Sequence, residues 1–150
     1  MSTQLADSFL NEQTAHFLTR DPWQDWTPTV TQDVAVTVTV IYARYIVISQ
    51  GVIVQARLSV TGSGTAGNAV VIAGIPSPIA AKNPNTYTII GGGFVVNTTA
   101  SVHYHGALMA NGANDWRIIT DGSNGFLGVN PSFALASGHQ ISLQAAYERA

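Results

Sequence analysis

The sequence contains no cysteine, which excludes disulfide bonds, thiol chemistry and zinc sites built on cysteine. Charged residues make up only 9% of the 150 residues, whereas an average soluble domain has roughly 25%. Lys and Arg together number six and the net charge is −2, so no basic surface for nucleic acid is expected. No apolar run approaches the roughly 18 residues that a membrane span requires. The first residues also lack the apolar run of a signal peptide. We therefore expect no nucleic-acid or membrane partner and a protein that is assembled in a cytoplasm.

What is present is enough apolar material for one folded domain. Apolar residues make up 46% of the chain, which excludes general disorder because disordered chains are apolar-poor and highly charged. A length of 150 residues suits one domain and is short for two. A surface so poor in charge is built from Thr, Ser, Asn and Gln or is covered by partners.

The first 21 residues differ in kind from the rest of the chain. No Gly or Pro occurs between Thr3 and Thr19, and Ser2 is suited to cap a helix. The pair Asp21-Pro22 ends the helical pattern, because the residue before a proline avoids the α region. At 100° per residue the apolar side chains form one stripe, which Gln13 and His16 interrupt and which consists of Leu5, Ala6, Phe9, Leu10 and Phe17. Residues 1–21 are predicted to be an amphipathic helix that anchors the protein.

The rest of the chain has the pattern of a β-protein. Residues 22–33 are rich in Trp and Pro and are predicted to link the helix to a β-domain at residues 34–150. Apolar and other residues alternate over 34–40, 52–60 and 141–147, which is the period of half-buried strands. Shorter β-like runs occur at Tyr45–Ile48, Ala69–Ile75, Tyr87–Ile90, Phe94–Asn97, Val102–Met109, Trp116–Thr120 and Phe133–Leu135. Short strands separated by turn clusters predict an antiparallel β-sandwich of jelly-roll type.

One motif has the letters of a dinucleotide-binding loop. Residues 62–67 read Gly-Ser-Gly-Thr-Ala-Gly and match GxGxxG. That motif binds a pyrophosphate only when a helix follows it, with an acidic residue about 20 positions later. Here a strand-like run follows, and no acidic residue occurs between Asp33 and Asp115. We interpret the motif as a turn and expect no cofactor.

Groups for hydrolysis are also scarce. Asp115 and Asp121 flank a strand-like run, so they would lie about 20 Å apart if it is extended, too far for the carboxyl pair of a glycosidase. No GxSxG elbow is present for a serine nucleophile. We expect no catalytic residues and no enzyme activity.

Two further groups of side chains stand out. His103 and His105 point to the same face of a strand; the pair alone cannot fill a metal's coordination sphere, although three copies around a threefold axis would. We expect packing or hydrogen bonding of this pair at a trimer axis, and no metal. Trp23, Trp26 and Pro28 are predicted to pin the linker to the β-domain, with stacking of an exposed Trp on a sugar as the alternative.

The β-part of the chain begins with an entry at 26–29, followed by Tyr42 and Arg44 and then by Gly51 before a long strand. This order resembles β-sandwich domains of tailed-bacteriophage virion proteins. The resemblance covers residues 23 to 150. It rests on an entry at 26–29, the turn at 61–68 leading to Gly74-Ile75-Pro76, and the ending Ala136-Ser137-Gly138-His139-Gln140-Ile141-Ser142 with Tyr147-Glu148. His139 stands where such domains carry Asp. The resemblance implies a trimeric virion protein without catalytic residues.

The choice among virion roles depends on the anchor. A short helix and linker before one β-domain favour a capsid decoration or head-fibre protein that docks on the major capsid protein through Leu5, Phe9, Leu10 and Phe17 and projects a β-knob. The alternatives are a tail-associated or receptor-binding fibre protein that contacts tail proteins or a host surface glycan, and a glycan-binding module or enzyme.

Overall fold

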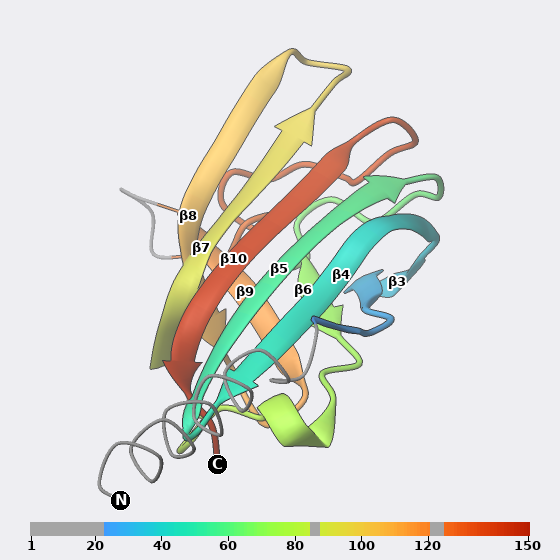
Figure 1. Cartoon of the computed structure of the whole chain (residues 1–150). Helices are drawn as coiled ribbons and strands as arrows, with labels where there is room; N and C mark the ends of the chain where they lie inside the picture. Colours follow the sequence, from blue (N-terminus) through green and yellow to red (C-terminus); the bar gives the residue numbers. More distant parts are fainter. Residues whose placement is uncertain (1–22, 85–87, 121–124) are drawn as a thin grey trace, which may run out of the picture.

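The computed structural model describes residues 23–84, 88–120 and 125–150. Within these ranges the chain is mainly β, as predicted, and ten antiparallel strands form a single curled sheet (Figure 1). The predicted helix at residues 1–21 lies outside the described residues. No helix within the described ranges is long and apolar enough to cross a membrane.

The strands are not neighbours in the order of the sequence. Across the sheet the order is β1-β4-β5-β10-β7-β8-β9-β6-β2-β3, so the last strand of the chain lies in the middle of the sheet. The elements are β1 (Gln24–Asp25), β2 (Thr29–Gln32), β3 (Val34–Val36), β4 (Val38–Ile48), β5 (Gly51–Val60), β6 (Val71–Ala73), a 3-10 turn η1 (Ser77–Ile79), β7 (Thr88–Asn97), β8 (Val102–Ala110), β9 (Asp115–Thr120) and β10 (Gln140–Glu148).

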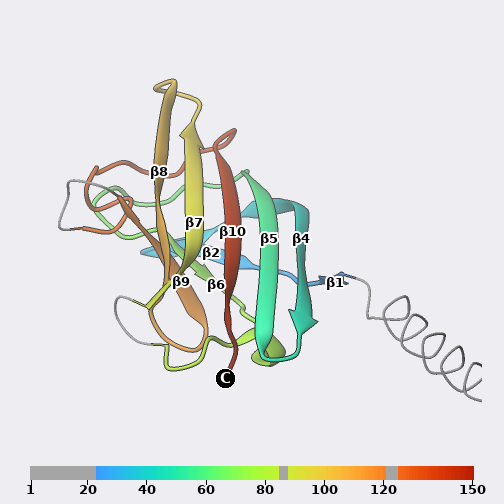
Figure 2. The same cartoon turned by 60° about the vertical axis from the view of Figure 1, so that its left-hand side comes forward.

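The curl brings the two halves of the sheet face to face. The long strands β4, β5, β10, β7 and β8 form one side, and β9, β6 and β2 lie behind them (Figure 2). One face of the long strands therefore looks inward onto the core, while the other looks out to solvent. The sheet has two edges, at β1 and β3.

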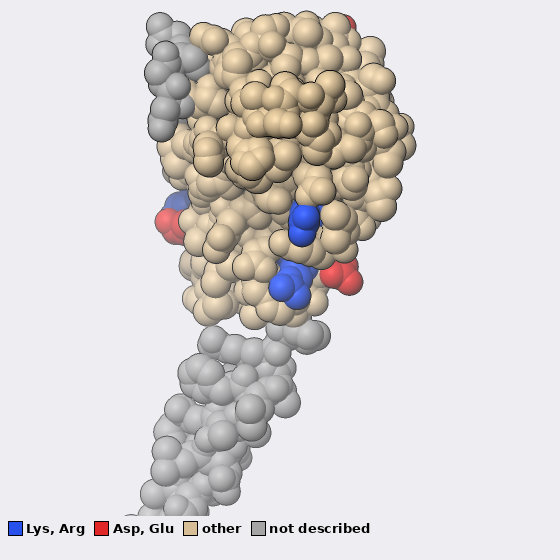
Figure 3. All heavy atoms as spheres, turned by 90° about the horizontal axis from the view of Figure 1, so that it is seen from above, with Lys and Arg blue, Asp and Glu red and all other residues tan. Residues whose placement is uncertain are grey.

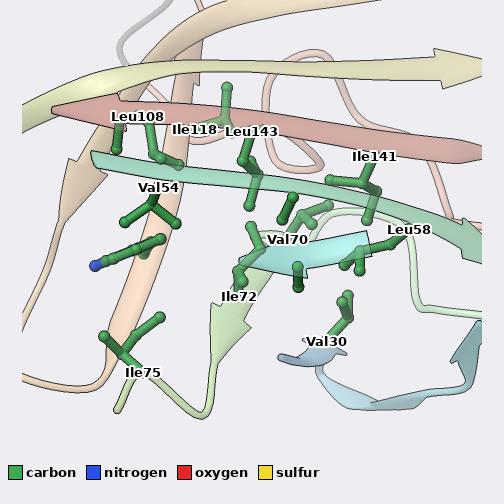
Figure 4. Close-up of a cluster of buried hydrophobic side chains, with 14 of the residues drawn as sticks. Val30, Val54, Leu58, Val70, Ile72, Ile75, Leu108, Ile118, Ile141 and Leu143 are labelled. Carbon is green, nitrogen blue, oxygen red and sulfur yellow. The ribbon is translucent and has the colours of Figure 1, made fainter. Parts of the chain in front are cut away.

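Alternation along the strands decides which side chains enter the core. In β5 every second residue from Val52 to Val60 is buried, and Ile141, Leu143 and Ala145 follow the same period in β10. Side chains from both halves of the curl meet in one cluster (Figure 4), including Val30, Val54, Leu58, Val70, Ile72, Ile75, Leu108, Ile118, Ile141 and Leu143. This cluster excludes water from the space between the two halves and is the main source of stability.

The segment predicted to be a linker contributes to the sheet. β1 pairs with β4, and β2 pairs with both β3 and β6. Val30 and Gln32 in β2 are almost completely buried. Because alternate residues of this segment point into the core, the sheet begins before residue 34, the predicted start of the β-domain.

One predicted strand is wrong. Residues 133–135 have apolar letters but form no strand, because a side chain takes the place of a partner strand. The amide of Gln32 donates from Nε2 to the Phe133 carbonyl (2.7 Å) and accepts at Oε1 from the Leu135 N–H (2.8 Å). The same Nε2 donates to the Asn68 carbonyl (3.1 Å). A single buried amide thus fixes two loops against β2.

Candidate functional site

An open groove of about 420 Å³ lies on the outer face of the long strands. All five of these strands contribute to it. The lining residues are Tyr42 from β4, Gln55 from β5, Gly92, Gly93 and Phe94 from β7, His105 from β8, and Ser142, Leu143 and Gln144 from β10.

Strand register places these side chains in two neighbouring rows. The first row crosses the sheet through Tyr42, Arg57, Ser142, Phe94 and His105. The second row, two residues along each strand, consists of Arg44, Gln55, Gln144, Gly92 and Ala107. Successive side chains of a strand point to opposite faces, so the same alternation that fills the core puts these residues outside.

Gly92 makes the groove hollow. It is exposed, and a Cβ added to it would meet only the Gly106 carbonyl oxygen, at 3.9 Å. Its neighbours in the second row are the long side chain of Gln144 on β10 and the small Ala107 on β8. Gly92 thus interrupts a row of side chains at a position where a Cβ would fit without a clash. The missing side chain leaves the sheet backbone exposed at this point of the groove.

Aromatic rings stand at both ends of the groove. On the β4 side the guanidinium of Arg44 lies 4.9 Å from the centre of the Trp23 ring and 5.6 Å from that of Tyr42, a cation–π arrangement that holds both rings. On the β7 side the Phe94 ring contacts the imidazoles of His103 (5.5 Å) and His105 (5.4 Å).

Between the rings the groove is polar but has no carboxylate. Gln55 and Gln144 supply amides and Ser142 a hydroxyl, groups that both donate and accept hydrogen bonds. Beside the groove, Arg44 donates to Gln55 Oε1 (3.3 Å) and Arg57 donates to Gln140 Oε1 (2.6 Å). None of the lining residues is Asp or Glu, so the groove lacks the pair of carboxyl groups that glycosidases use.

The glycine motif at 62–67 is a turn, as predicted, and it is followed by β6 instead of a helix. The amide groups of its three glycines all donate hydrogen bonds within the protein. Gly62 donates to the Thr37 carbonyl (2.9 Å), Gly64 to the Leu135 carbonyl (2.9 Å) and Gly67 to the Gly128 carbonyl (3.0 Å). Backbone N–H groups that bind a phosphate must be free to point at it, so this turn does not form a phosphate site.

The two histidines predicted to lie together share one exposed face. His103 and His105 point outward from β8, where both contact Phe94. In the described part of the chain, no three His, Asp or Glu side chains gather in a way that holds a metal ion.

Of the two carboxylates weighed for hydrolysis, Asp121 lies outside the described residues. Asp115 accepts hydrogen bonds from Arg117 and Asn111, each at 3.3 Å. These contacts fix the start of β9 and use the carboxylate of Asp115 within the fold.

The Trp and Pro residues before the sheet have different environments. Trp26 and Pro28 are buried, and the Trp26 ring meets Trp116 edge-on at 5.8 Å between centroids. Trp23 is 37% exposed and lies against Arg44 near the groove. The predicted docking residues Leu5, Phe9, Leu10 and Phe17 lie outside the described residues.

Comparison with protein-family models, with curated proteins and with solved structures found no match to this chain. Fold and groove together define a curled β-sheet protein with an open groove on its outer face. A function must therefore be proposed from the residues themselves.

Proposed function

We propose that the protein is a structural component of a tailed-bacteriophage particle, a capsid decoration or head-fibre protein without enzyme activity. Residues 1–21 attach it to the major capsid protein, and the β-domain, folded as a jelly-roll-like sandwich, is displayed on the particle as a homotrimer. Neither nucleic acid nor a membrane is a partner in this role.

The observation that carries this proposal concerns the residues behind the phage resemblance. Those at 61–68 and 136–139 form turns whose backbone groups bond to neighbouring loops and strands. These residues therefore serve the fold, and charged groups are few because they make up only 9% of the chain. Figure 3, a view onto one end of the domain, shows few charged side chains. A displayed scaffold protein fits this surface better than an enzyme does.

The attachment is tested with single substitutions in the full chain. Phe9→Asp places a charge in the predicted apolar stripe, whereas Asn11→Asp places the same charge on the opposite side of the predicted helix. Burial of a Phe is worth roughly 1.5–3 kcal/mol, so Phe9→Asp is expected to lower the occupancy on particles and Asn11→Asp to leave it unchanged. Equal occupancy of both variants, measured by quantitative mass spectrometry of purified particles, would refute docking through this stripe.

A second function, receptor binding by a tail-associated fibre protein, is favoured by the outer-face groove. Gold-labelled antibodies against the β-domain distinguish the two functions on intact particles. Label on the capsid supports decoration, whereas label on the tail together with blocked adsorption to cells supports receptor binding.

A further inference from the structure

We propose that the outer-face groove binds a linear oligosaccharide, held between Tyr42 and Phe94 and contacted by Gln55, Ser142 and Gln144. This proposal goes beyond attachment to the particle. The groove lies on the long strands, whereas the proposed docking residues lie in residues 1–21. The proposed saccharide site is therefore compatible with attachment to the capsid and with attachment to the tail.

Two aromatic rings at the ends of a polar groove suit a saccharide. One face of a sugar ring carries mainly C–H groups, which pack against the electron-rich face of an aromatic ring. Tyr42 is 42% exposed, although it is held by Arg44, so it is available and ordered before a ligand arrives. Such preorganisation reduces the entropy lost on binding.

The polar groups match sugar hydroxyls in kind. Each hydroxyl donates one hydrogen bond and accepts others, and the amides of Gln55 and Gln144 and the hydroxyl of Ser142 do both as well. A carboxylate would only accept, and an ammonium group would only donate. The absence of both types from the groove lining favours a ligand rich in hydroxyls over a strongly charged one.

The shape of the groove favours a chain of sugars. Tyr42 and Phe94 are separated by three strand spacings, from β4 to β5, β5 to β10 and β10 to β7, which amounts to ~14 Å between their Cα atoms. The hollow at Gly92 lies beside this path and lets a ring approach the sheet backbone. A small cofactor would instead require an enclosed pocket that covers most of its surface.

Other polymers fit this face poorly. Nucleic acid requires a cluster of Lys and Arg to neutralise phosphates. Neither type lines the groove, and the two arginines beside it, Arg44 and Arg57, donate to Gln55 and Gln140. A peptide that adds to a sheet requires a free edge, whereas β5, β10 and β7 are paired on both sides. A saccharide needs neither feature.

The test uses the purified full chain and a glycan array that carries bacterial surface oligosaccharides. The oligosaccharide with the strongest signal is then titrated calorimetrically into the wild type and three variants. Gly92→Val fills the hollow without backbone strain and is expected to weaken binding at least tenfold. Gln144→Ala removes one exposed amide and is expected to weaken binding several-fold.

Ala146→Val is the matched control, because it adds bulk to the same face of β10 outside the groove. It is expected to change the dissociation constant less than twofold, and circular dichroism verifies that all variants are folded. If Gly92→Val does not fold, Gln144→Ala still decides the question. The bound oligosaccharide is expected to be recovered intact, because the groove has no carboxylate that would cleave it.

Three results would overturn the proposal. One is an array without signal, and another is unchanged affinity in both Gly92→Val and Gln144→Ala. The third is a lower sedimentation mass of Gly92→Val, which would identify the groove as a contact between copies of the chain. None of these results bears on attachment through residues 1–21, so the two proposals fail independently.

Discussion

Gln32 is a buried polar residue whose amide makes hydrogen bonds that the apolar side chains of the core cannot make. Its side chain is fully buried and makes three hydrogen bonds, to Asn68, Phe133 and Leu135. Gly64 lies so close that a Cβ there would overlap Gln32 Oε1. The glycine of the turn and the glutamine of β2 therefore depend on each other, and the turn is glycine-rich for packing.

Replacing Gln32 tests this dependence. Gln32→Met keeps the length of the side chain but leaves the Leu135 N–H and the Phe133 carbonyl without their partner. An unsatisfied buried group costs ~1–3 kcal/mol, so we expect the free energy of unfolding in urea to fall by about 3 kcal/mol. Gln50→Met, at an exposed turn, is the control and is expected to change it by less than ~0.5 kcal/mol. Equal losses of unfolding free energy in Gln32→Met and Gln50→Met would contradict a stabilising role of the Gln32 hydrogen bonds.

His139 is the one buried histidine among the described residues, and we expect it to contribute to the pH dependence of stability. It is 1% exposed, and its Nδ1 accepts a hydrogen bond from the Ala136 N–H (3.2 Å). Burial lowers the pKa of His139 below its ordinary value of 6.5, because a charged imidazole loses its hydration there. The unfolded chain therefore binds a proton at a higher pH than the folded protein does.

The sign of the pH effect follows from this difference. Stability from neutral His139 is fully present above pH 6.5 and decreases as the pH falls below that value toward the lowered pKa, by up to ~1.4 kcal/mol per pH unit. His139→Asn retains an acceptor for Ala136 and is expected to flatten the dependence in thermal unfolding between pH 7 and pH 5. His103→Asn, on the exposed face, is expected to leave it as in the wild type. A wild-type slope in His139→Asn would refute the assignment.

At the scale of elements, β10 holds the long strands together. It pairs with β5 over nine residues on one side and with β7 over six on the other. Ser142 lies opposite both Arg57 and Phe94, so every backbone polar group around it faces a partner strand. A strand that is paired on both sides is expected to be disrupted when one of its backbone N–H donors is lost.

Proline at this position tests the central role of β10. Ser142→Pro removes an N–H from the ladder and is incompatible with an interior strand. We expect an unfolded or aggregated chain, detected by circular dichroism and sedimentation. Ser142→Thr keeps the donor and suits a strand, so it is expected to fold like the wild type. A folded Ser142→Pro protein would show that β10 is dispensable for pairing.

At the scale of the whole molecule, the outer surface retains large apolar side chains. They lie on several strands and in one turn and include Val34, Ile41, Ile48, Ile89, Val102 and Val129, between 38% and 54% exposed. Surfaces with few charges and exposed apolar groups are typical of contacts between proteins, and closed symmetric assembly buries such groups.

We therefore expect a homotrimer of the full chain. Sedimentation equilibrium at micromolar concentration is expected to give three times the chain mass of 15.8 kDa, with each subunit contact burying more than about 1,000 Å². A mass of one chain across the concentration range would contradict this assembly. Dilution provides the control, because the average molecular mass in solution falls with concentration only when the protein associates reversibly.

The sequence alone predicted the elements whose physics is local. Alternation identified β5 and β10, because side chains of a strand point to opposite faces whatever the strand pairs with. The sequence also identified the motif at 62–67 as a turn, because a dinucleotide-binding loop requires a helix after it and the residues that follow have the pattern of a strand. Residues 133–135 were misjudged because the partner is a side chain from β2, about 100 residues away, which no local pattern reveals.

Tertiary structure alone decided the groove. Gln55, Gly92 and Gln144 each have an outward position that alternation predicts, but nothing in their separate segments indicates that they are neighbours. They meet because β10 inserts between β5 and β7, a pairing set by the collective burial of the core. Sequence determines which face a residue takes through local geometry, whereas the strand order that assembles a site depends on contacts between distant segments.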